Sequence, residues 1–208
     1  MDNSELLFVP TASGDAEGYC RAVRRAYENL GCSASVLRLV ENPDDPEAIG
    51  EKIDAADAVY VGGGDTDFML DIWANHEVKD RLRTAGRSGT LLTGLSAGAN
   101  CWFAGSYGDS TSNDTDFALT DGLRVPPFRC TPYAGVSDRL DGFGEYVRGR
   151  EAVGIAIGNG AVFEARTGTD EFRVRSYLDE EVYRVTGAGN GGRKQLPVGE
   201  WRPLNELR

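Results

Sequence analysis

Histidine is almost absent from this sequence, since His76 is the only one among 208 residues. A protein metal site draws on several His, Cys or carboxylate ligands at short spacing, and metal binding has little support from a single histidine without paired ligands. We therefore expect no metal and no other cofactor. The same scarcity bears on catalysis, because histidine is the side chain most often used as a general base.

The sequence also lacks a Cys-x-x-Cys pair and any long apolar run. Widely spaced cysteines without such a motif are typical of reduced thiols in a cytoplasmic protein. The N-terminus has no basic segment of the kind that opens a signal peptide. No apolar stretch approaches the ~20 residues of a membrane span. These features predict a cytoplasmic protein whose four cysteines stay free: Cys20, Cys32, Cys101 and Cys130.

Clusters of basic residues are missing as well. The chain carries 22 Lys and Arg against 33 Asp and Glu, a formal net charge of −11. Nucleic acids and anionic membranes attract basic surfaces, so the sequence argues against both as partners. The expected partner is a small peptide or an acidic small molecule, and the sequence leaves open whether the chain forms a homodimer.

What the sequence does contain is a regular alternation of strand-like and helix-like segments. We expect one α/β domain over residues 1–208, with a mostly parallel, doubly wound sheet and helices on both faces. Three later strands predict an antiparallel C-terminal extension, and the Gly-rich tail, 187–208, is expected to be poorly ordered. The expected strands lie within 5–14, 35–40, 57–62, 91–95, 128–131, 154–157, 161–165, 171–177 and 181–186. The expected helices lie within 16–30, 47–55, 68–83 (broken near residue 75) and 138–148.

The segment Gly94-Leu95-Ser96-Ala97-Gly98 matches the G-x-S-x-G pattern of a nucleophile elbow. An apolar strand precedes it and a helix-compatible run follows. A serine on such a tight turn has strained backbone geometry and points its hydroxyl away from the sheet. The pattern is also compatible with an ordinary strand-to-helix turn that contains a serine.

A second glycine-rich turn, Gly62-Gly63-Gly64, follows the strand expected at 57–62. The spacing of a dinucleotide-binding fingerprint is absent. The turn is either a plain connection or a place where backbone amides approach a ligand closely. In the second case a glycine N–H would complete an oxyanion hole beside the Ala97 N–H.

Taken together, these motifs resemble the peptidase E family, relatives of cyanophycinase with the class I glutamine amidotransferase-like fold. The resemblance covers about residues 6–186 and implies a flavodoxin-like sheet. Members are serine exopeptidases that cleave N-terminal aspartyl dipeptides or related acidic peptide bonds. The matching segments are Phe8-Val-Pro-Thr-Ala-Ser13, Val61-Gly-Gly-Gly-Asp-Thr66, Gly94-Leu-Ser-Ala-Gly-Ala-Asn100, Cys101-Trp-Phe103 and Gly108-Asp-Ser110.

The resemblance implies a role for several residues. It makes Ser96 the nucleophile and gives the oxyanion contacts to Ala97 and to the turn at Gly63 and Gly64. The acidic residue that the family needs beyond its nucleophile corresponds to Asp109.

Two positions of the family's catalytic triad do not match. Pro132 or Tyr133 stands where the family has its histidine, and Asn159 stands where it has the carboxylate that orients this histidine. His76 does not replace it, because it is expected near a helix end on the far side of the sheet. Both partners are missing together, which indicates a lost relay.

Without a histidine, the activation of Ser96 is an open question. Asp109 is one candidate base, although an ordinary carboxylate is a weak base for an alcohol. Alternatively, Asp109 shapes a pocket for acidic substrates. Three functions follow: a peptidase E-like serine hydrolase, a catalytically impaired relative that binds a peptide or acidic metabolite, or an amidotransferase-like or esterase activity on reactive acyl groups. The polar segment 105–121 is expected to be a loop over the site.

Overall fold

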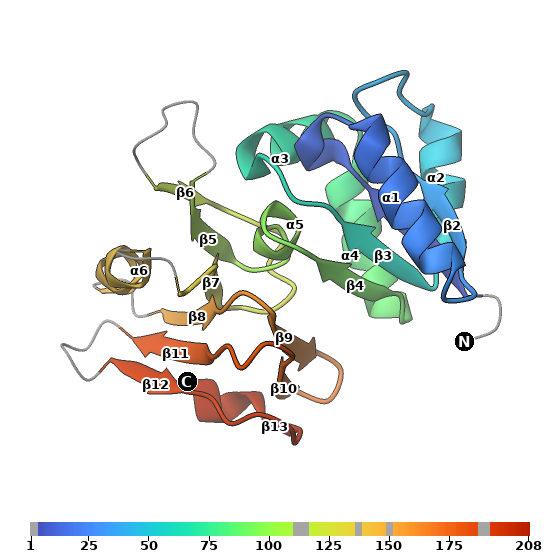
Figure 1. Cartoon of the computed structure of the whole chain (residues 1–208). Coiled ribbons are helices and arrows are strands. Elements are labelled where there is room, and N and C mark those ends of the chain that lie inside the picture. The colour runs from blue at the N-terminus through green and yellow to red at the C-terminus, as the bar shows by residue number, and fades with distance from the viewer. Residues whose placement is uncertain (1–3, 110–116, 136–138, 149–151, 187–191) are drawn as a thin grey trace. The chain divides into compact units, whose positions relative to one another are not determined.

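A computed structural model of the chain describes residues 4–109, 117–135, 139–148, 152–186 and 192–208 (Figure 1). The described residues form two compact units, one over 4–101 and the other over 102–208. Each unit has its own sheet and core and is described by itself. The single-domain organisation stays a prediction.

The first unit contains a four-stranded parallel sheet in the order β2-β1-β3-β4 (Figure 1). Its strands are β1 (Glu5–Val9), β2 (Ser33–Val36), β3 (Ala58–Val61) and β4 (Leu91–Gly94). Its helices are η1 (Thr11–Ser13), α1 (Glu17–Glu28), α2 (Pro46–Asp54), α3 (Thr66–Asn75), α4 (Val78–Ser88) and α5 (Ala97–Asn100).

Side chains that alternate along the strands bury both faces of this sheet. Phe8 and Tyr60 are neighbours in the register of β1 and β3, and Phe8 packs with Val23 of α1. On the other face, Leu92 of β4 lies against Gly86 of α4, where an added β-carbon would be 2.7 Å from the leucine Cδ1. The sheet is therefore covered on both sides, as the sequence predicts.

Two boundaries in this unit have clear local causes. The strand predicted at 35–40 ends at Val36, because the N–H groups of residues 39–41 donate to the Asp15 carboxylate instead of continuing the ladder. The predicted break near residue 75 is confirmed. His76 caps the end of α3, and Glu77 has a left-handed φ of 56° before α4 begins.

The second unit has a six-stranded mixed sheet in the order β12-β11-β8-β7-β5-β6 and a three-stranded antiparallel sheet in the order β13-β10-β9. Its strands are β5 (Gly105–Gly108), β6 (Ala118–Thr120), β7 (Arg129–Pro132), β8 (Val153–Ile157), β9 (Ala161–Arg166), β10 (Glu171–Ser176), β11 (Val182–Thr186), β12 (Arg193–Gln195) and β13 (Arg202–Pro203). The helices are α6 (Arg139–Val147) and the short η3 (Leu204–Leu207).

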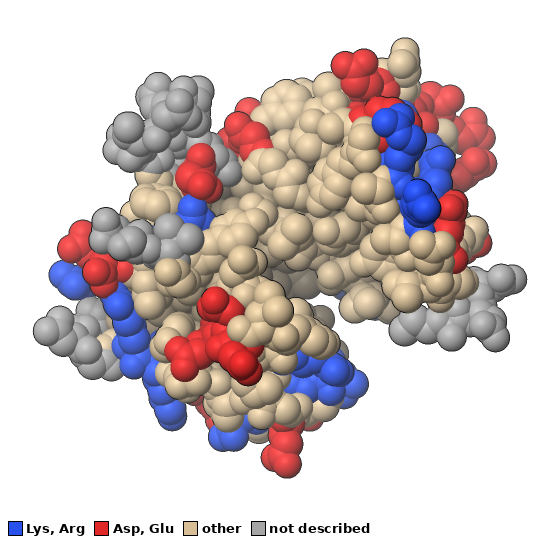
Figure 2. All heavy atoms as spheres, viewed as in Figure 1, with Lys and Arg blue, Asp and Glu red and all other residues tan. Residues whose placement is uncertain are grey.

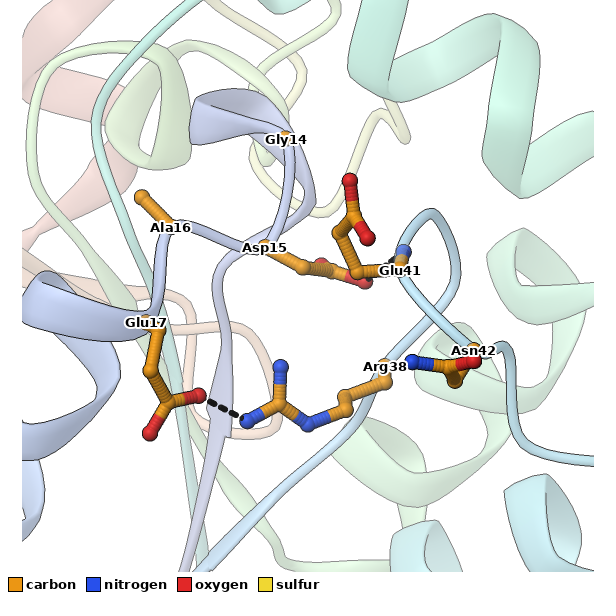
Figure 3. A pocket seen from close by; sticks show the side chains of 7 residues that line it. All are labelled: Gly14, Asp15, Ala16, Glu17, Arg38, Glu41 and Asn42. Atoms are coloured by element: carbon orange, nitrogen blue, oxygen red, sulfur yellow. Dashed lines mark hydrogen bonds and ion pairs between the residues drawn. The ribbon is translucent and has the colours of Figure 1, made fainter.

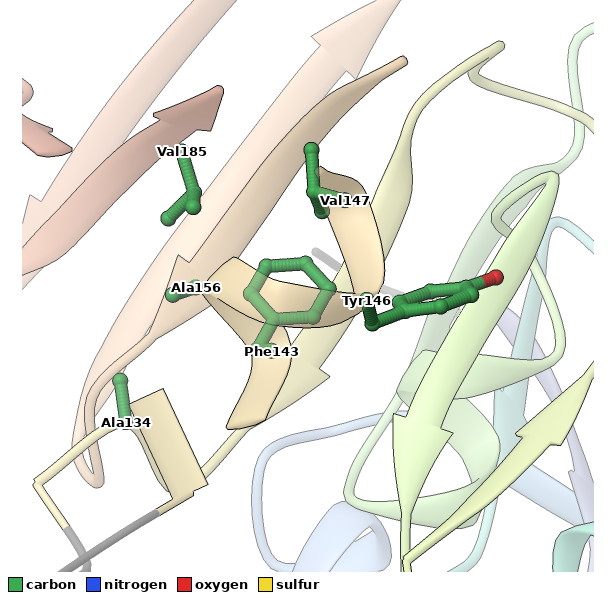
Figure 4. Close-up of a cluster of buried hydrophobic side chains, with 6 residues drawn as sticks. All are labelled: Ala134, Phe143, Tyr146, Val147, Ala156 and Val185. Carbon is green, nitrogen blue, oxygen red and sulfur yellow. The ribbon is translucent and has the colours of Figure 1, made fainter. Parts of the chain in front are cut away.

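Helix α6 supplies much of the hydrophobic core beside the larger sheet. Figure 4 shows Phe143, Tyr146 and Val147 of α6 gathered with Ala156 of β8 and Val185 of β11. Strands β5, β7 and β8 are parallel, so their carboxyl ends lie at one edge of the sheet. The prediction of an α/β fold with a parallel sheet and an antiparallel C-terminal extension is confirmed.

Two local predictions in this unit need correction. The last three strands do not form one meander: β9 pairs with β10, whereas β11 pairs with β8. The predicted loop at 105–121 begins and ends in an antiparallel pair, β5 with β6. Its middle, 110–116, lies outside the described residues, so closure over a site stays a prediction.

The C-terminal tail also differs from the expectation. Residues 192–208 form β12, β13 and η3, because their leucines are buried: Leu196, Leu204 and Leu207. Residues 187–191 lie outside the described part of the chain. The prediction of poor order rested on the glycine-rich and polar composition of this segment, which did not reveal that these leucines are buried.

The remaining features are the length of the helices, the charges on the surface and the state of the cysteines. No helix within the described ranges combines the length and apolar character that a bilayer span requires. Basic side chains visible on the first unit are bordered by acidic ones (Figure 2). In the same unit, Arg21 and Arg38 each pair with Glu17. All four cysteines are free, as predicted.

Candidate active site

Ser96 lies between β4 and α5 in a backbone conformation that L-amino acids rarely adopt. Its φ and ψ are 55° and −116°, outside the regions favoured by a residue with a β-carbon. Such strain persists only where the surroundings enforce it, and it clusters at functional sites. The Ser96 side chain is half-buried, so it is not part of the packed interior.

The two glycines that flank Ser96 are required by close backbone contacts. A β-carbon on Gly94 would lie 2.9 Å from the Gly98 Cα and would overlap the Gly98 carbonyl. A β-carbon on Gly98 would lie 3.0 Å from the Gly62 carbonyl oxygen and would overlap that of Val61. Only glycine fits at either position without a backbone shift. The spacing of the motif is therefore explained by the turn itself.

The glycine turn after β3 lies on the same rim of the sheet as Ser96. A β-carbon added to Gly63 would be 3.3 Å from the Ser96 Cβ and 3.9 Å from its Oγ. Gly64, with a φ of 143°, packs against the turn after β1, where an added β-carbon would lie 2.8 Å from the Ser13 nitrogen. All four strands are parallel, but the strand order β2-β1-β3-β4 changes direction between β1 and β3. In such folds ligands bind beside the point where the strand order changes direction.

Backbone amides near Ser96 differ in their availability. The Gly63 N–H donates a long hydrogen bond of 3.5 Å to the Tyr19 hydroxyl. Among the described residues of this unit, no hydrogen bond uses the Ala97 or Gly64 N–H as donor. Neither amide is therefore engaged within this unit. No described residue of the unit forms a hydrogen bond with the Ser96 hydroxyl.

Two buried hydrogen bonds fix the turns around the serine, and the sequence gave no sign of them. Asn100, at the end of α5, donates through Nδ2 to Thr66 Oγ1 at the start of α3, at 3.2 Å. Trp73 donates through Nε1 to Thr11 Oγ1 in the turn after β1, also at 3.2 Å. Together they connect the serine turn, the glycine turn and the turn after β1.

Other side chains that could act as a nucleophile or a base are two cysteines and the histidine, and none of them is seen to contact the Ser96 hydroxyl. Cys101 is buried, and its thiol donates to the Gly98 carbonyl at 3.2 Å, as expected for a core residue. Burial raises the pKa of the Cys130 thiol, which keeps it neutral and unreactive. His76 ends α3, roughly 15 Å along the helix axis from its start. The first unit therefore offers no histidine beside Ser96.

The remaining predicted residues belong to the second unit and lie at one edge of its sheet. Asp109 follows β5, Pro132 ends β7 and is followed by Tyr133, and Asn159 comes two residues after β8. These three strands are parallel. Tyr133 has a left-handed φ of 57°, a conformation that is uncommon for a bulky side chain.

Arg139, the first residue of α6, gathers several of these residues around its guanidinium. It forms an ion pair of 2.9 Å with Asp109 Oδ2 and donates to the Pro132 carbonyl at 3.2 Å. The rings of Phe117 and Tyr133 lie 4.9 and 5.5 Å from its Cζ. These contacts of Arg139 were not predicted from the sequence. The available signal was a basic residue at a helix start, where the helix dipole disfavours it.

Glu180 is a second residue that the sequence analysis missed. Its Oε2 lies 2.7 Å from the position of a β-carbon on Gly158 and 3.6 Å from one on Gly135. The carboxylate thus lies beside Gly158, next to Asn159, although it comes from the turn before β11. No short motif reveals this, because the contact depends on the pairing of β11 with β8.

A cavity of about 600 Å³ opens at the carboxyl ends of β1 and β2 (Figure 3). Its lining comprises Gly14, Asp15, Ala16, Glu17, Arg38, Glu41 and Asn42, and does not include Ser96. The Arg38 guanidinium pairs with Glu17 across it, and Asp15 Oδ2 accepts three N–H bonds from residues 39–41 at 2.7–3.1 Å. These bonds hold the two loops together. Among the described residues no group of His, Cys, Asp or Glu is placed to hold a metal ion.

The fold and the serine turn define an α/β protein with a strained serine at the carboxyl edge of a parallel sheet. Residues 1–170 match Peptidase family S51, and the chain belongs to this family. The resemblance to peptidase E is thereby confirmed.

Individual relatives support the same family. The chain is 29% identical over 193 residues to the uncharacterized peptidase YgaJ of Bacillus subtilis, covering 92% of this chain and 77% of that protein. It is 36% identical over 97 residues to Peptidase E of Streptomyces coelicolor, covering 47% of this chain and 37% of that protein. Matches to the Peptidase E relatives span 37–61% of their length.

A solved structure shows the same fold. The crystal structure of a peptidase from an acI-B1 Actinobacterium superposes with a TM-score of 0.75 at 23% identity, covering 96% of this chain and 83% of that one.

Proposed function

We propose that this member of a peptidase family is a serine hydrolase that acts on small peptides with an N-terminal aspartate. Ser96 Oγ attacks the carbonyl carbon and gives up its proton, the C–N bond breaks, and the amine leaves carrying that proton. Water then releases the acyl group from Ser96. The observation that carries the proposal is the strained Ser96 against the Gly63 turn, with the N–H groups of the next residue, Ala97, and of Gly64 in that turn both unengaged.

The oxyanion contacts are assigned to the Ala97 and Gly64 N–H groups. Donors that are fixed before the reaction stabilise the developing negative charge without reorganisation. The Gly63 N–H is assigned a lesser role, because the Tyr19 hydroxyl already accepts from it. The hydrogen bond between Asn100 and Thr66 holds the serine turn against the helix that follows the glycines.

The rate is expected to be low. Removing a triad base costs on the order of 10⁴–10⁶-fold, and the oxyanion hole and substrate binding retain some catalysis. Pro132 or Tyr133 stands where the family pattern has its histidine, and Asn159 stands where it has its carboxylate. Substrates with a better leaving group, such as activated esters, depend less on a base, so we expect them to react faster than peptides.

A second candidate function is binding without turnover, and it is favoured by the same two substitutions. In that case a peptide or acidic metabolite occupies the inherited pocket and no bond is broken. The two candidates make different predictions about the reactivity of Ser96, because a binding protein has no need of an activated hydroxyl.

Covalent labelling distinguishes them. The protein is treated with a fluorophosphonate probe and the modified residue is located by mass spectrometry. Hydrolysis of Asp-Leu and of p-nitrophenyl acetate is measured in parallel. Labelling that is lost in Ser96→Ala and kept in Ser88→Ala, an exposed serine of α4, supports the hydrolase. Absence of both labelling and hydrolysis leaves the binding function.

A further inference from the structure

One face of the small antiparallel sheet in the second unit is rich in arginine. Side chains directly opposite each other in such a sheet point to the same face. The pairs on this face of β9 and β10 are Arg166 with Glu171, Glu164 with Arg173 and Val162 with Arg175. The other face carries Phe172 and Val174 into the core. The outer face thus presents more cations than anions, in a chain whose formal net charge is −11.

Glu164 is fully engaged by two of these arginines. Its Oε2 accepts a hydrogen bond of 2.7 Å from Arg173 Nε, and its Oε1 accepts one of 2.8 Å from Arg175 Nε. These are charge-assisted bonds, which are the strong ones in proteins. The carboxylate of Glu164 therefore serves Arg173 and Arg175, and Arg166 depends on other partners.

The Arg166 guanidinium keeps its hydrogen-bond donors. Its Nη1 lies 3.9 Å from Glu171 Oε2, which is beyond hydrogen-bond distance, and that oxygen accepts from the Thr169 hydroxyl at 2.7 Å. The described residues provide no hydrogen bond to this guanidinium. Its side chain is 54% exposed, so the donors face solvent.

The half-buried ring of Trp201 holds Arg166 in place. Arg166 Cζ lies 3.8 Å from the centre of the ring, and Arg173 Cζ lies 4.4 Å from it. A guanidinium stacked on an aromatic ring is fixed in its plane, while its N–H edge stays available. A donor group that is ordered before binding loses less entropy when a ligand arrives. Two positive charges at one ring also attract an anion.

We propose that Arg166, held on the Trp201 ring, binds the oxyanion group of a small molecule, either a carboxylate or a phosphate. Both groups present two oxygens to the fork of a guanidinium and accept two parallel hydrogen bonds. Arg173 adds positive charge at the ring, whereas the Glu171 carboxylate weakens the attraction. The site lies apart from the residues assigned to hydrolysis and does not depend on the proposed function.

The test measures the binding of two probes, inorganic phosphate and succinate, to the full chain by calorimetry. Sodium chloride keeps the ionic strength constant. Arg166→Met should weaken binding by about 10- to 100-fold, the range for hydrogen bonds to a charged group. Arg166→Lys should restore only part of it, because lysine keeps the charge and lacks the fork. Glu171→Gln should strengthen binding, because it removes a nearby negative charge.

Arg87 provides the matched control. It is an exposed arginine of α4, in the first unit, and no ion pair of the described residues includes it. Arg87→Met makes the same change in net charge and should leave both dissociation constants unchanged. Melting temperatures identify any variant that fails to fold. If Arg166→Met is unfolded, Glu171→Gln, which keeps the shape of the side chain, carries the test.

Three outcomes overturn the inference: binding of neither probe by the parent protein, equal binding by Arg166→Met and the parent, and an equal loss in Arg166→Met and Arg87→Met. Weaker binding by Glu171→Gln also contradicts it. A preference of the parent for phosphate or for succinate supports the site and identifies which of the two groups it takes. Labelling of Ser96 should be the same in Arg166→Met and the parent, so the proposed function is tested separately.

Discussion

Gly63 lies directly against Ser96, so that a β-carbon on this glycine would be 3.3 Å from the Ser96 Cβ. The two residues follow adjacent parallel strands, β3 and β4. At the carboxyl ends of these strands Val61 is paired with Gly94. Because a larger residue at position 63 would press on the serine, the glycine turn and the serine turn are mutually dependent. The close packing of these turns leads to the first prediction.

Gly98→Ala should destabilise the protein, whereas Gly18→Ala should stabilise it. Both glycines lie in helices and have ordinary φ, but a β-carbon at position 98 would overlap backbone while position 18 has open space around it. We expect a loss of about 1–3 kcal/mol for Gly98→Ala and a gain of about 0.5–1 kcal/mol for Gly18→Ala. Urea denaturation measures the free energy of unfolding of both variants. Equal effects would show that the serine turn shifts to accept a β-carbon at position 98.

The strain at Ser96 predicts that Ser96→Gly is more stable than Ser96→Ala. Glycine adopts positive φ without cost, whereas alanine keeps the β-carbon that causes the strain. At a φ of 55° and a ψ of −116°, we expect a difference of about 1–3 kcal/mol in the free energy of unfolding. Both variants lack the hydroxyl, so both should lose labelling. An alanine variant as stable as the glycine variant would mean that the turn relaxes in solution.

The sequence predicted the parts of the site that depend on local chain geometry. The spacing of Gly94, Ser96 and Gly98 follows from the turn, and Gly64 of the triplet follows from its close approach to the turn after β1. Arg139 and Glu180 escaped notice because their contacts depend on strand pairings between segments far apart in the sequence. The early end of β2 was missed for a similar reason, since it depends on the Asp15 carboxylate.

The ion pair between Glu17 and Arg38 predicts a pH-dependent stability. The hydrogen bond from Arg38 lowers the pKa of the Glu17 carboxyl below its ordinary value. Its stabilising effect is therefore complete above the unfolded-state pKa, about 4.3, and is lost as the pH falls through the lower folded-state value. At pH 7 the melting temperature of the wild type should be higher than that of Glu17→Gln. The difference between the two melting temperatures should disappear in acid.

Glu28→Gln is the control for this prediction. Glu28 ends the same helix and is exposed, and no ion pair of the described residues includes it. Its substitution should change the melting temperature little at either pH. A difference for Glu17→Gln that persists unchanged below pH 3 or so would assign the effect to packing rather than to charge.

The two mismatched triad positions predict a gain of function. Tyr133→His combined with Asn159→Glu should raise the hydrolysis of Asp-Leu at least about tenfold, towards the 10⁴-fold that a triad base supplies. Histidine tolerates the left-handed φ of 57° at position 133 better than most residues. Each single substitution should give less, because the carboxylate orients the histidine. The added rate should vanish in the Ser96→Ala background and should fall below the pKa of a histidine, about 6.5. A double variant that folds yet shows no gain would mean that these two substitutions are not what limits the rate.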